Sequence, residues 1–288
     1  MNLGEEMALV RERLSEPHRT DETNAFVRDL EIVRWIAQGE LQCLRDLVDD
    51  ALYTVQKEAT VSLTAGVGPL PADFMRLVTV QVQLKAGGIF VEADLVSPKQ
   101  NRNLTQSPQW RPSAMRPFCY IFQNKLYVFP VTANAVNLRY VYRPDRRYKL
   151  YTGVHNGASS LVTFSSTAME QLTADFWLNS EMTINNGVRQ GESRTCTGST
   201  GAAPPILTVN SFSAQVIQGT NFTIGEVSKL PAELYPLWIA WAAALGFQKD
   251  REAQNAENEK EIYATAVKTI NERYQGLNRA EPVKEMPR

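Results

Sequence analysis

The stretch that decides the fold is LPAELYPLWIAWAAALGF, residues 230–247. Pro231 suits the first turn of a helix, where the N–H group that proline lacks would have no partner. The residues after it are apolar over a wide arc of the predicted helix: Leu234, Leu237, Trp238, Trp241, Leu245 and Phe247. Such a helix cannot bury its apolar surface alone, so other elements of the chain must cover it.

Two further segments have helical periodicity. In residues 20–52, apolar residues recur at steps of three and four. Candidate N-cap oxygens stand at the start of this segment, on Thr20, Asp21 and Thr23. Gly39 is expected to bend or split the helix, because glycine in a helix interior costs about 1 kcal/mol relative to alanine. A third helix is predicted in residues 251–274, so helices from opposite ends of the chain are expected to pack together.

The middle of the chain has a period of two, which is typical of half-buried strands. RLVTVQVQL (76–84) and NLRYVYR (137–143) alternate apolar and polar residues, and CYIFQNKLYVFP (119–130) predicts a hairpin with its turn at Gln123–Lys125. After a turn-rich segment, RPDRRYKLYTGVHNG, five short strands are predicted. They are SSLVTF, EMTIN, ESRTCTG, PILTV and NFTIG, separated by glycine, asparagine and proline as in a small sandwich or barrel.

These patterns predict an α+β fold: a helical bundle built from the N- and C-terminal segments, with a β-rich middle that contains an inserted small β-sandwich or barrel module. The expected parts are an N-terminal helical segment (1–57), a β-rich region (58–150), the inserted module (151–227), a C-terminal helix pair (228–274) and a flexible tail (275–288).

Composition excludes several classes of protein. The 30 basic and 31 acidic residues give a formal charge of −1, which argues against a dedicated DNA-binding protein. Three widely spaced cysteines without a CxxC pair predict reduced thiols rather than a disulfide framework. The first twenty residues lack the basic and apolar parts of a signal peptide, and no stretch approaches the roughly 18 apolar residues of a membrane span. We therefore expect synthesis in a cytoplasm and no membrane partner.

The stretch NNGVRQGESRTCTGST, residues 185–200, is the best candidate for chemistry, and it lacks the necessary frames. Ser193 is not in a G-x-S-x-G elbow, and the glycines match no phosphate-binding loop. The only histidines, His18 and His155, are interpreted as exposed or capping residues, and the cysteines lack zinc-ligand spacing. We predict no catalytic residue, no cofactor and no metal. Gly187 and Gly191 are instead expected to adopt backbone angles that other residues avoid, with Arg194 anchoring the loop and Cys196 as a buried thiol.

One basic cluster is interleaved with aromatic residues. Its members are Arg143, Arg146, Arg147 and Lys149, among Tyr140, Tyr142, Tyr148 and Tyr151. Such a cluster is typical of a nucleic-acid surface or of a protein interface, and without a basic domain around it we favour contact with a protein partner. The tail, QGLNRAEPVKEMPR, has no periodicity and is expected to be disordered until bound. Its candidate contact residues are Leu277, Val283, Met286 and Arg288.

The order of these parts resembles the head-to-tail adaptor proteins of tailed bacteriophages, also called head-completion or connector proteins. The resemblance rests on IVRWIAQGELQCLRDL, on PLPADFMRLVTVQV with its LP-x-DF-x-R pattern, on NKLYVFPVTANAVNLRYVYRP, and on the closing helix pair that begins at LPAELYPLW. Residues 175–225 are also similar to a β-module common in phage virion proteins. GSTGAAPP replaces the aromatic–Asp–Gly turn of that module, which puts the type of turn in doubt.

The resemblance implies a structural virion protein that is not an enzyme. It implies a ring of copies, twelve-fold like the portal, seated between the portal protein and a tail, nozzle or tail-terminator protein. Genomic DNA would pass through the lumen without specific binding, which suits the near-zero net charge. The protein would be made in the host cytoplasm and located at the neck of the virion.

Two other classes stay open at this point. A tail-fibre protein with a receptor- or carbohydrate-binding β-module would explain the strands but not the flanking helix pair. A virion-associated glycan hydrolase would need paired carboxylates, for which Asp175, Glu181 and Glu192 are the candidates.

Overall fold

The computed structural model describes residues 1–14, 28–83, 89–100, 112–113, 115–130, 135–145, 147, 149–170 and 173–278. These residues form helices and mostly antiparallel β-sheets, which confirms the mixed α+β fold class. Contacts divide the chain into two units. The first unit combines Met1–Leu47 with Asp145–Arg288, and the second is Val48–Pro144.

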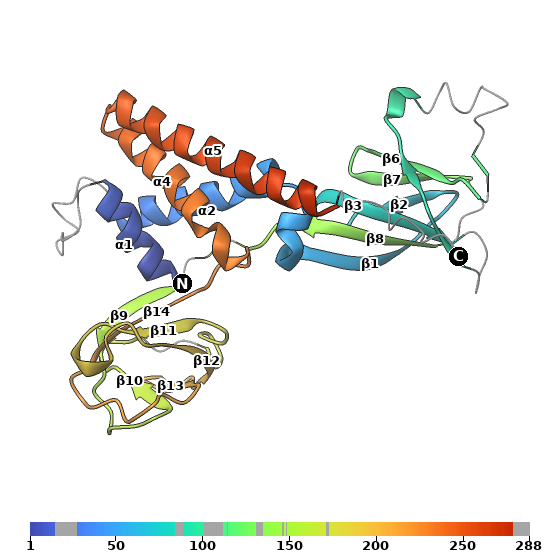
Figure 1. Cartoon of the computed structure of the whole chain (residues 1–288). Helices are drawn as coiled ribbons and strands as arrows, with labels where there is room; N and C mark the ends of the chain where they lie inside the picture. The colour runs from blue at the N-terminus through green and yellow to red at the C-terminus, as the bar shows by residue number, and fades with distance from the viewer. Residues whose placement is uncertain are drawn as a thin grey trace, which may run out of the picture. The chain divides into compact units, whose positions relative to one another are not determined.

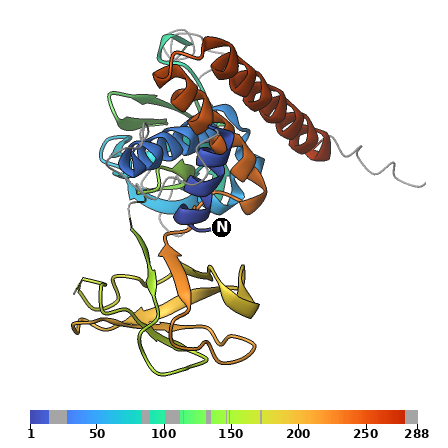
Figure 2. The same cartoon turned by 90° about the vertical axis from the view of Figure 1, so that its left-hand side faces the viewer.

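Helix α4 (Tyr235–Lys249) is the centre of the helical part of the first unit. It contacts α1 (Leu3–Arg13), α2 (Asp29–Asp46) and α5 (Ala253–Asn278), and both views show it among them (Figures 1 and 2). Its buried residues cover most of the helix circumference: Leu237, Trp238, Ile239, Ala240, Ala242, Ala243, Ala244 and Gly246. This covering by three neighbours explains why residues 230–247 are apolar over so wide an arc.

The helix boundaries differ from the predicted ones in several places. The helix predicted over residues 20–52 begins at Asp29 and ends at Asp46, and a 3₁₀ helix, η1 (Asp49–Val55), follows it. The three predicted N-cap residues lie outside the described residues. No separate helix was predicted over residues 3–13, where α1 lies, although these residues were placed in the N-terminal helical segment (1–57). The predicted tail overlaps α5, which continues to Asn278, so residues 275–278 are helical.

Prolines mark the start of α4 differently from the prediction. Pro231 is the N-cap of a short 3₁₀ helix, η4 (Ala232–Leu234), and Pro236 occupies the first turn of α4 itself. Both placements follow the same physical rule, because a backbone N–H in the first turn of a helix has no intrahelical acceptor.

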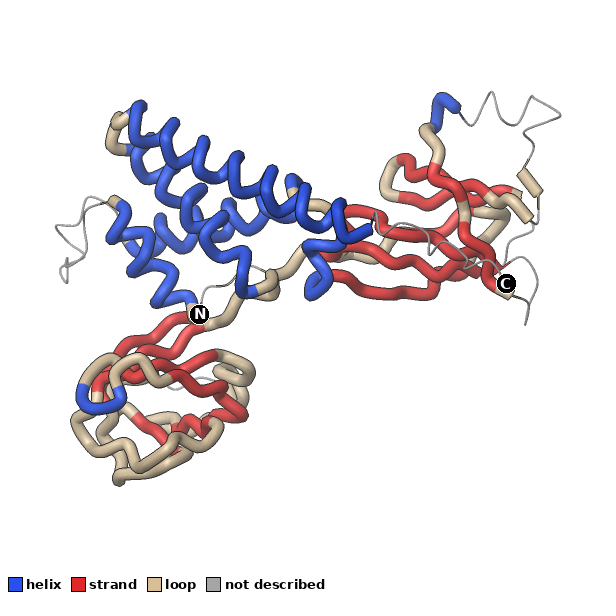
Figure 3. The backbone as a smooth tube through the Cα atoms, viewed as in Figure 1, coloured by secondary structure: helices blue, strands red, loops and turns tan. Residues whose placement is uncertain are grey.

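The first unit also contains a β-module with its own hydrophobic core. Its strands are β9 (Leu150–Val154), β10 (Thr163–Ser165), β11 (Glu181–Ile184), β12 (Ser193–Ser199), β13 (Ile206–Val209) and β14 (Asn221–Gly225). They form one sheet in the order β10-β13-β12-β11-β14-β9, and loops make up much of the remaining module (Figure 3). Phe164, Met182 and Phe222 are among the core residues. Strand β9 lies in the segment that was interpreted as turn-rich.

The loop between β11 and β12 has the predicted backbone. Gly187 and Gly191 have φ angles of 78° and 86°, in the left-handed region that favours glycine. Arg194 anchors this part of the module by donating to the carbonyl oxygens of Ser193 and Ser211 and to Glu192. The stretch that looked most like a catalytic loop is thus a hydrogen-bonded corner of the sheet.

The described residues of the second unit include η1, a helical turn at residues 98–100 and eight strands in two sheets. One sheet has the order β1-β8-β3-β4 and the other β2-β7-β6-β5. The strands are β1 (Gln56–Ser62), β2 (Val67–Pro69), β3 (Phe74–Gln83), β4 (Phe90–Glu92), β5 (Asp94–Leu95), β6 (Phe118–Phe122), β7 (Lys125–Phe129) and β8 (Ala135–Tyr142). The predicted hairpin is confirmed: β6 and β7 are joined by Gln123 and Asn124, whose φ angles of 48° and 60° are typical of a type I′ turn.

Each packed region of the protein contains one buried cysteine. Cys43 lies in α2, Cys119 in the core of the second unit and Cys196 in the core of the β-module. Burial raises the pKa of Cys119 to about 12 and also raises the pKa of the other two thiols. Because the thiolate is the reactive form, none of the three should react readily in the folded protein.

We expect these thiols to report local opening of the three regions. Three single-cysteine variants, each with the other two thiols replaced by alanine, should react with an aromatic disulfide reagent many-fold more slowly than unfolded protein in urea. Reaction would then follow opening of the region that holds the thiol. Labelling of the folded Cys196 variant at the rate of the unfolded chain would contradict a buried thiol in the β-module.

Candidate functional site

The first turn of α1 lies against the β-module. The helix begins with a capping box, in which Asn2 Oδ1 accepts from the Glu5 backbone N–H at 3.0 Å and Glu5 Oε2 accepts from the Asn2 N–H at 3.1 Å. This reciprocal pair satisfies two N–H groups that a helix start leaves without partners. It also fixes the directions of both side chains, so that their remaining polar atoms, Asn2 Nδ2 and Glu5 Oε1, can form hydrogen bonds with the module.

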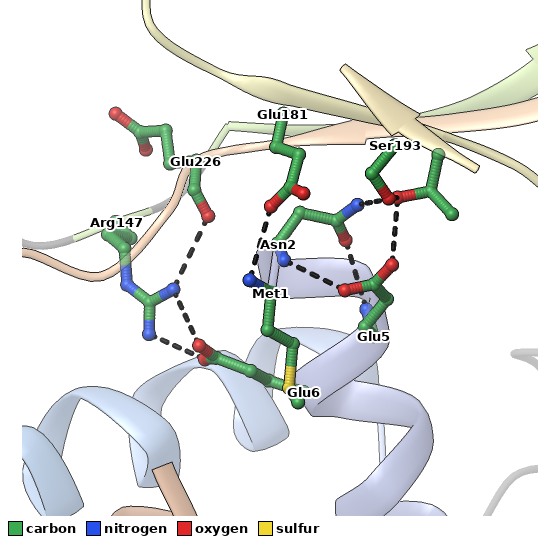
Figure 4. A network of polar contacts seen from close by, with 9 residues as sticks. Met1, Asn2, Glu5, Glu6, Arg147, Glu181, Ser193 and Glu226 are labelled. Carbon is green, nitrogen blue, oxygen red and sulfur yellow. Dashed lines mark hydrogen bonds and ion pairs between the residues drawn. The ribbon is translucent and has the colours of Figure 1, made fainter. Parts of the chain in front are cut away.

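Asn2 and Glu5 contact Thr183 of β11. Figure 4 shows the two helix residues at close range, together with Ser193 of the sheet. Asn2 Nδ2 donates to Thr183 Oγ1 at 2.9 Å, and the Thr183 hydroxyl is 2.8 Å from Glu5 Oε1. Ser193 Oγ of β12 is 2.7 Å from the same hydroxyl. We call Asn2, Glu5 and Thr183 the Thr183 contact. Beside it, the amino group of Met1 pairs with Glu181 at 3.2 Å.

Thr183 belongs to a row of hydroxyl residues that crosses the module sheet. Strand register places Ser193, Thr183, Thr223 and Thr152 opposite one another on β12, β11, β14 and β9. Thr152 Oγ1 and Thr223 Oγ1 are 3.0 Å apart. Thr183 therefore bonds to α1 as well as to its own sheet, whereas Thr152 bonds within the sheet.

A buried ion cluster lies next to this contact. The Arg147 guanidinium forms two bonds with Glu6 of α1, from Nη1 to Oε1 at 3.1 Å and from Nη2 to Oε2 at 2.5 Å. Its Nη2 also pairs with Glu40 of α2 at 2.8 Å, and Nη1 donates to the carbonyl oxygen of Glu226 at 3.3 Å. We call Glu6, Glu40 and Arg147 the Arg147 cluster. It ties both helices to the two chain segments that enter and leave the module.

The Arg147 cluster is almost completely shielded from water. Arg147 is 7% exposed and Glu6 is 0% exposed. Burial raises the pKa of the Glu6 carboxyl, and Arg147 offsets only part of that rise. The two carboxylates raise the pKa of Arg147 and outweigh its burial. A paired geometry of this kind is required wherever a guanidinium is removed from water.

Close backbone approach completes the junction. A Cβ atom at Gly4 would lie 2.6 Å from Thr223 Cγ2, so the glycine lets α1 lie against this side chain of β14 without displacing it. The Leu3 N–H donates to the carbonyl oxygen of Glu226 at 3.0 Å, and Asn2 forms a β-bridge with Val227. This junction was not predicted from the sequence, although the N-x-x-E pattern at residues 2–5 indicates a capping box.

The predicted contact cluster is divided by the structure. Arg143 is exposed, whereas Arg147 is buried in the ion cluster. Lys149 Nζ donates to the Phe176 carbonyl oxygen at 2.9 Å and lies over the Phe176 ring. Arg146, Tyr148, Val283, Met286 and Arg288 lie outside the described residues, and Leu277 lies in the last turns of α5. Contact of these residues with a partner stays a prediction.

The residues considered for chemistry have other partners. Asp175 accepts from the Ser199 N–H at 3.3 Å, Glu181 pairs with Met1, and Glu192 pairs with Arg194 at 2.6 Å. His155 was predicted to be an exposed or capping residue, and it is buried rather than exposed. Its ring nitrogens lie within hydrogen-bond distance of the Ser165 and Ala158 carbonyl oxygens. His18 is outside the described residues.

Two kinds of special site are absent from the described part of the chain. No group of three or more histidine, cysteine, aspartate or glutamate residues there could hold a metal ion. Among the helices that the structure describes, none has the length and apolar character needed to cross a membrane.

In the second unit, the LPADFMR motif forms a corner of the sheet. Asp73 pairs with Lys57 of β1 at 2.6 Å, accepts from the Tyr140 hydroxyl of β8 at 3.0 Å, and accepts the Arg143 N–H at its carbonyl oxygen at 2.8 Å. The bond from Lys57 lowers the pKa of Asp73. Phe74 packs on the Tyr140 ring at 5.7 Å. The motif thus links β1, β3 and β8 at one point.

Comparison with known proteins identifies the family. No curated protein matches the chain. The model of the SU10 adaptor protein family matches residues 1–150, which is more than half of the 288 residues. The matched residues include α1, α2 and the whole second unit, with the LPADFMR corner. The chain therefore belongs to the SU10 adaptor protein family, a family of phage head-to-tail adaptors.

Proposed function

We propose that the protein forms a ring between the portal and the tail of a phage virion, with a lumen through which DNA passes. The observation that carries this proposal is the family match over residues 1–150. Members of a phage adaptor family are structural virion components that interact with head and tail components, and the family is not one of enzymes. The ring, its twelve copies and its place at the neck go beyond that match and are our inference.

The charge of the chain supports a passive lumen. Thirty basic residues balance thirty-one acidic ones. A protein that neutralises many phosphates binds DNA tightly and resists its movement, whereas a neutral ring does not. In our proposal DNA therefore passes without specific binding, and the exposed Arg143 meets a protein partner.

In this proposal the helical and β-rich parts of the chain contact different partners. The helices of both chain ends form one bundle in this proposal, and together with the tail that follows α5 they face the portal. The β-rich region and the inserted β-module face the tail or a neighbouring copy. Packing of α4 against α1 and α2 supports the bundle, because α4 would otherwise expose Trp238 and Ile239.

Binding to a purified portal ring tests the proposal directly. We expect the full chain to form a complex with the portal that contains twelve adaptor copies, as measured by native mass spectrometry. A matched variant ending at Asn278 keeps α5 complete, including the bond from Asn271 to the Asp46 carbonyl oxygen. It should bind the portal less tightly if the tail contributes a contact.

The outcomes separate the parts of the proposal. If the variant ending at Asn278 bound the portal as tightly as the full chain, the proposed role of the tail would be contradicted. The proposal of a ring on the portal would not be affected. Absence of any complex between the full chain and the portal would contradict the proposed position of the ring. Binding of free duplex DNA at physiological salt would contradict the passive lumen.

A further inference from the structure

The junction between α1 and the β-module has two parts of different chemistry. Around Glu226, where the chain leaves the module, there are buried and apolar contacts: the Arg147 cluster, and Leu3 and Leu150 packed beside Gly225. Farther along the sheet, the Thr183 contact consists of hydrogen bonds between polar side chains, and an ion pair lies beside it. Figure 4 shows Arg147 and Glu226 at one end of this network and Ser193 at the other.

The two parts should differ in how easily they open. Separating the Arg147 cluster would break several charge-assisted bonds of one guanidinium at once, those to Glu6, Glu40 and the Glu226 carbonyl oxygen, and such bonds are stronger than neutral ones. The Thr183 contact is also buried, with Asn2 0% and Thr183 5% exposed, but only two side-chain hydrogen bonds join it to α1. Water replaces these bonds on opening, so their net loss is smaller than that of the cluster. The hydrophobic core of the module is also its own, since the residues that form it lie between Phe164 and Ile224 and include none of the helical residues.

We propose that the β-module is an arm that opens and closes on α1, with the Arg147 cluster as the fixed pivot and the Thr183 contact as the reversible latch. In the closed state Thr183 bonds to Asn2 and Glu5. In the open state these bonds go to water, while Arg147 keeps both module-flanking segments on the helices. The inference depends on the contacts of the folded chain and not on the proposed ring, although such an arm would let a subunit adjust to its neighbours.

The hydroxyl row provides a matched set of variants. Thr183→Val removes the hydroxyl that bonds to α1, and Thr183→Ser keeps it. Thr152→Val makes the same isosteric change in the same row, where the partner is Thr223 of the sheet itself. Glu5→Ala removes the contact from the helix side. A difference between Thr183→Val and Thr152→Val therefore reports the contact with α1 and not a general effect on the sheet.

Distances between two spin labels in the full chain test the inference. One label replaces Ala8, which is exposed on α1, and the other replaces Val188, which is exposed at the tip of the loop between β11 and β12. Pulsed electron resonance should show a dominant closed distance and a minor longer one. We expect Thr183→Val and Glu5→Ala to increase the longer population several-fold, and Thr183→Ser and Thr152→Val to leave it as in the parent chain.

Several results would overturn the arm. One is a single unchanged distance in Thr183→Val and Glu5→Ala, both with native helical circular dichroism. Another is equal opening in Thr183→Ser, which would show that the hydroxyl is not what holds the module. If Thr183→Val failed to fold, Glu5→Ala alone would decide the question. Portal binding is not measured in this experiment, so its result is independent of the proposed ring.

Discussion

Replacing Arg147 by alanine should lower the free energy of unfolding by about 3–5 kcal/mol. This is a large part of the roughly 5–15 kcal/mol that stabilises a typical domain. Arg147 is 7% exposed and holds the buried Glu6 carboxylate by two bonds and Glu40 by a third. Without the guanidinium, two carboxylates would face each other with no counter-charge in a site that water barely reaches.

Urea unfolding of the full chain, followed by helical circular dichroism, measures this loss. Two companion variants separate charge from packing. Arg147→Lys keeps the charge but not the planar fork that reaches both carboxylates, so an intermediate loss is expected. The double variant Glu6→Gln/Arg147→Ala lacks one of the two unpaired carboxylate charges. This variant should therefore be more stable than Arg147→Ala alone. A loss below about 1 kcal/mol for Arg147→Ala would contradict a buried ion cluster.

The Glu6 carboxyl also predicts a pH dependence. Burial raises its pKa in the folded protein above its ordinary value of 4.5. The folded state then binds the proton more tightly than the unfolded state. The contribution of Glu6 to the free energy of unfolding is therefore fully present below pH 4.5 and is lost as pH rises through the folded pKa. Glu6→Gln should abolish this part of the dependence of the free energy of unfolding on pH. The matched variant Glu5→Gln, whose side chain lies one residue away on α1, should not.

Arg147 shows why the site could not be predicted from the sequence. A run of arginine, lysine and tyrosine residues is typical of an interface, and the sequence does not say which of them is buried. Its partner Glu6 lies 141 residues away, in the predicted N-terminal helical segment, where no separate first helix was expected. A buried ion pair is decided by tertiary packing, and neither partner carries a local signal of it.

Local rules were sufficient where the structure depends on neighbouring residues. The period of two predicted β3 and β8, and the turn at Gln123–Asn124 followed from the residues between two apolar runs. Glycine φ angles at positions 187 and 191 were also predicted, because a loop between strands demands them. Strand β9 was missed since its partner, β14, lies about seventy residues later and the intervening composition is turn-rich.

Gly39 shows the opposite failure, in which a correct local rule gave a wrong structure. Glycine weakens a helix, so a bend or a split was expected, yet the helix is not split at this position: α2 runs unbroken from Asp29 to Asp46. A Cβ atom at position 39 would lie 2.6 Å from the Trp238 carbonyl oxygen and 3.0 Å from its Cα. The glycine therefore allows close approach of α2 to the backbone of α4, a requirement that only the packed pair of helices reveals.

Substituting Gly39 by alanine should therefore destabilise the protein by about 1–3 kcal/mol. This is the reverse of the gain of up to about 1 kcal/mol that alanine brings to an unpacked helix. The atoms in its way are backbone atoms of α4, and Trp238 is 1% exposed, so neither helix can yield without separating the other contacts of α4. The measurement is again urea unfolding of the full chain, with helical circular dichroism as the signal.

Gly246→Ala is the matched control, because it makes the same substitution inside α4. A Cβ atom there would meet the side-chain ends of Leu14 at 2.7 Å, and such atoms can move aside. We expect Gly246→Ala to be neutral or slightly stabilising while Gly39→Ala is destabilising, although both replace a buried helical glycine. If both variants were equally stable, α2 and α4 would not be packed at backbone distance, and the tight pairing of helices from the two chain ends would be refuted.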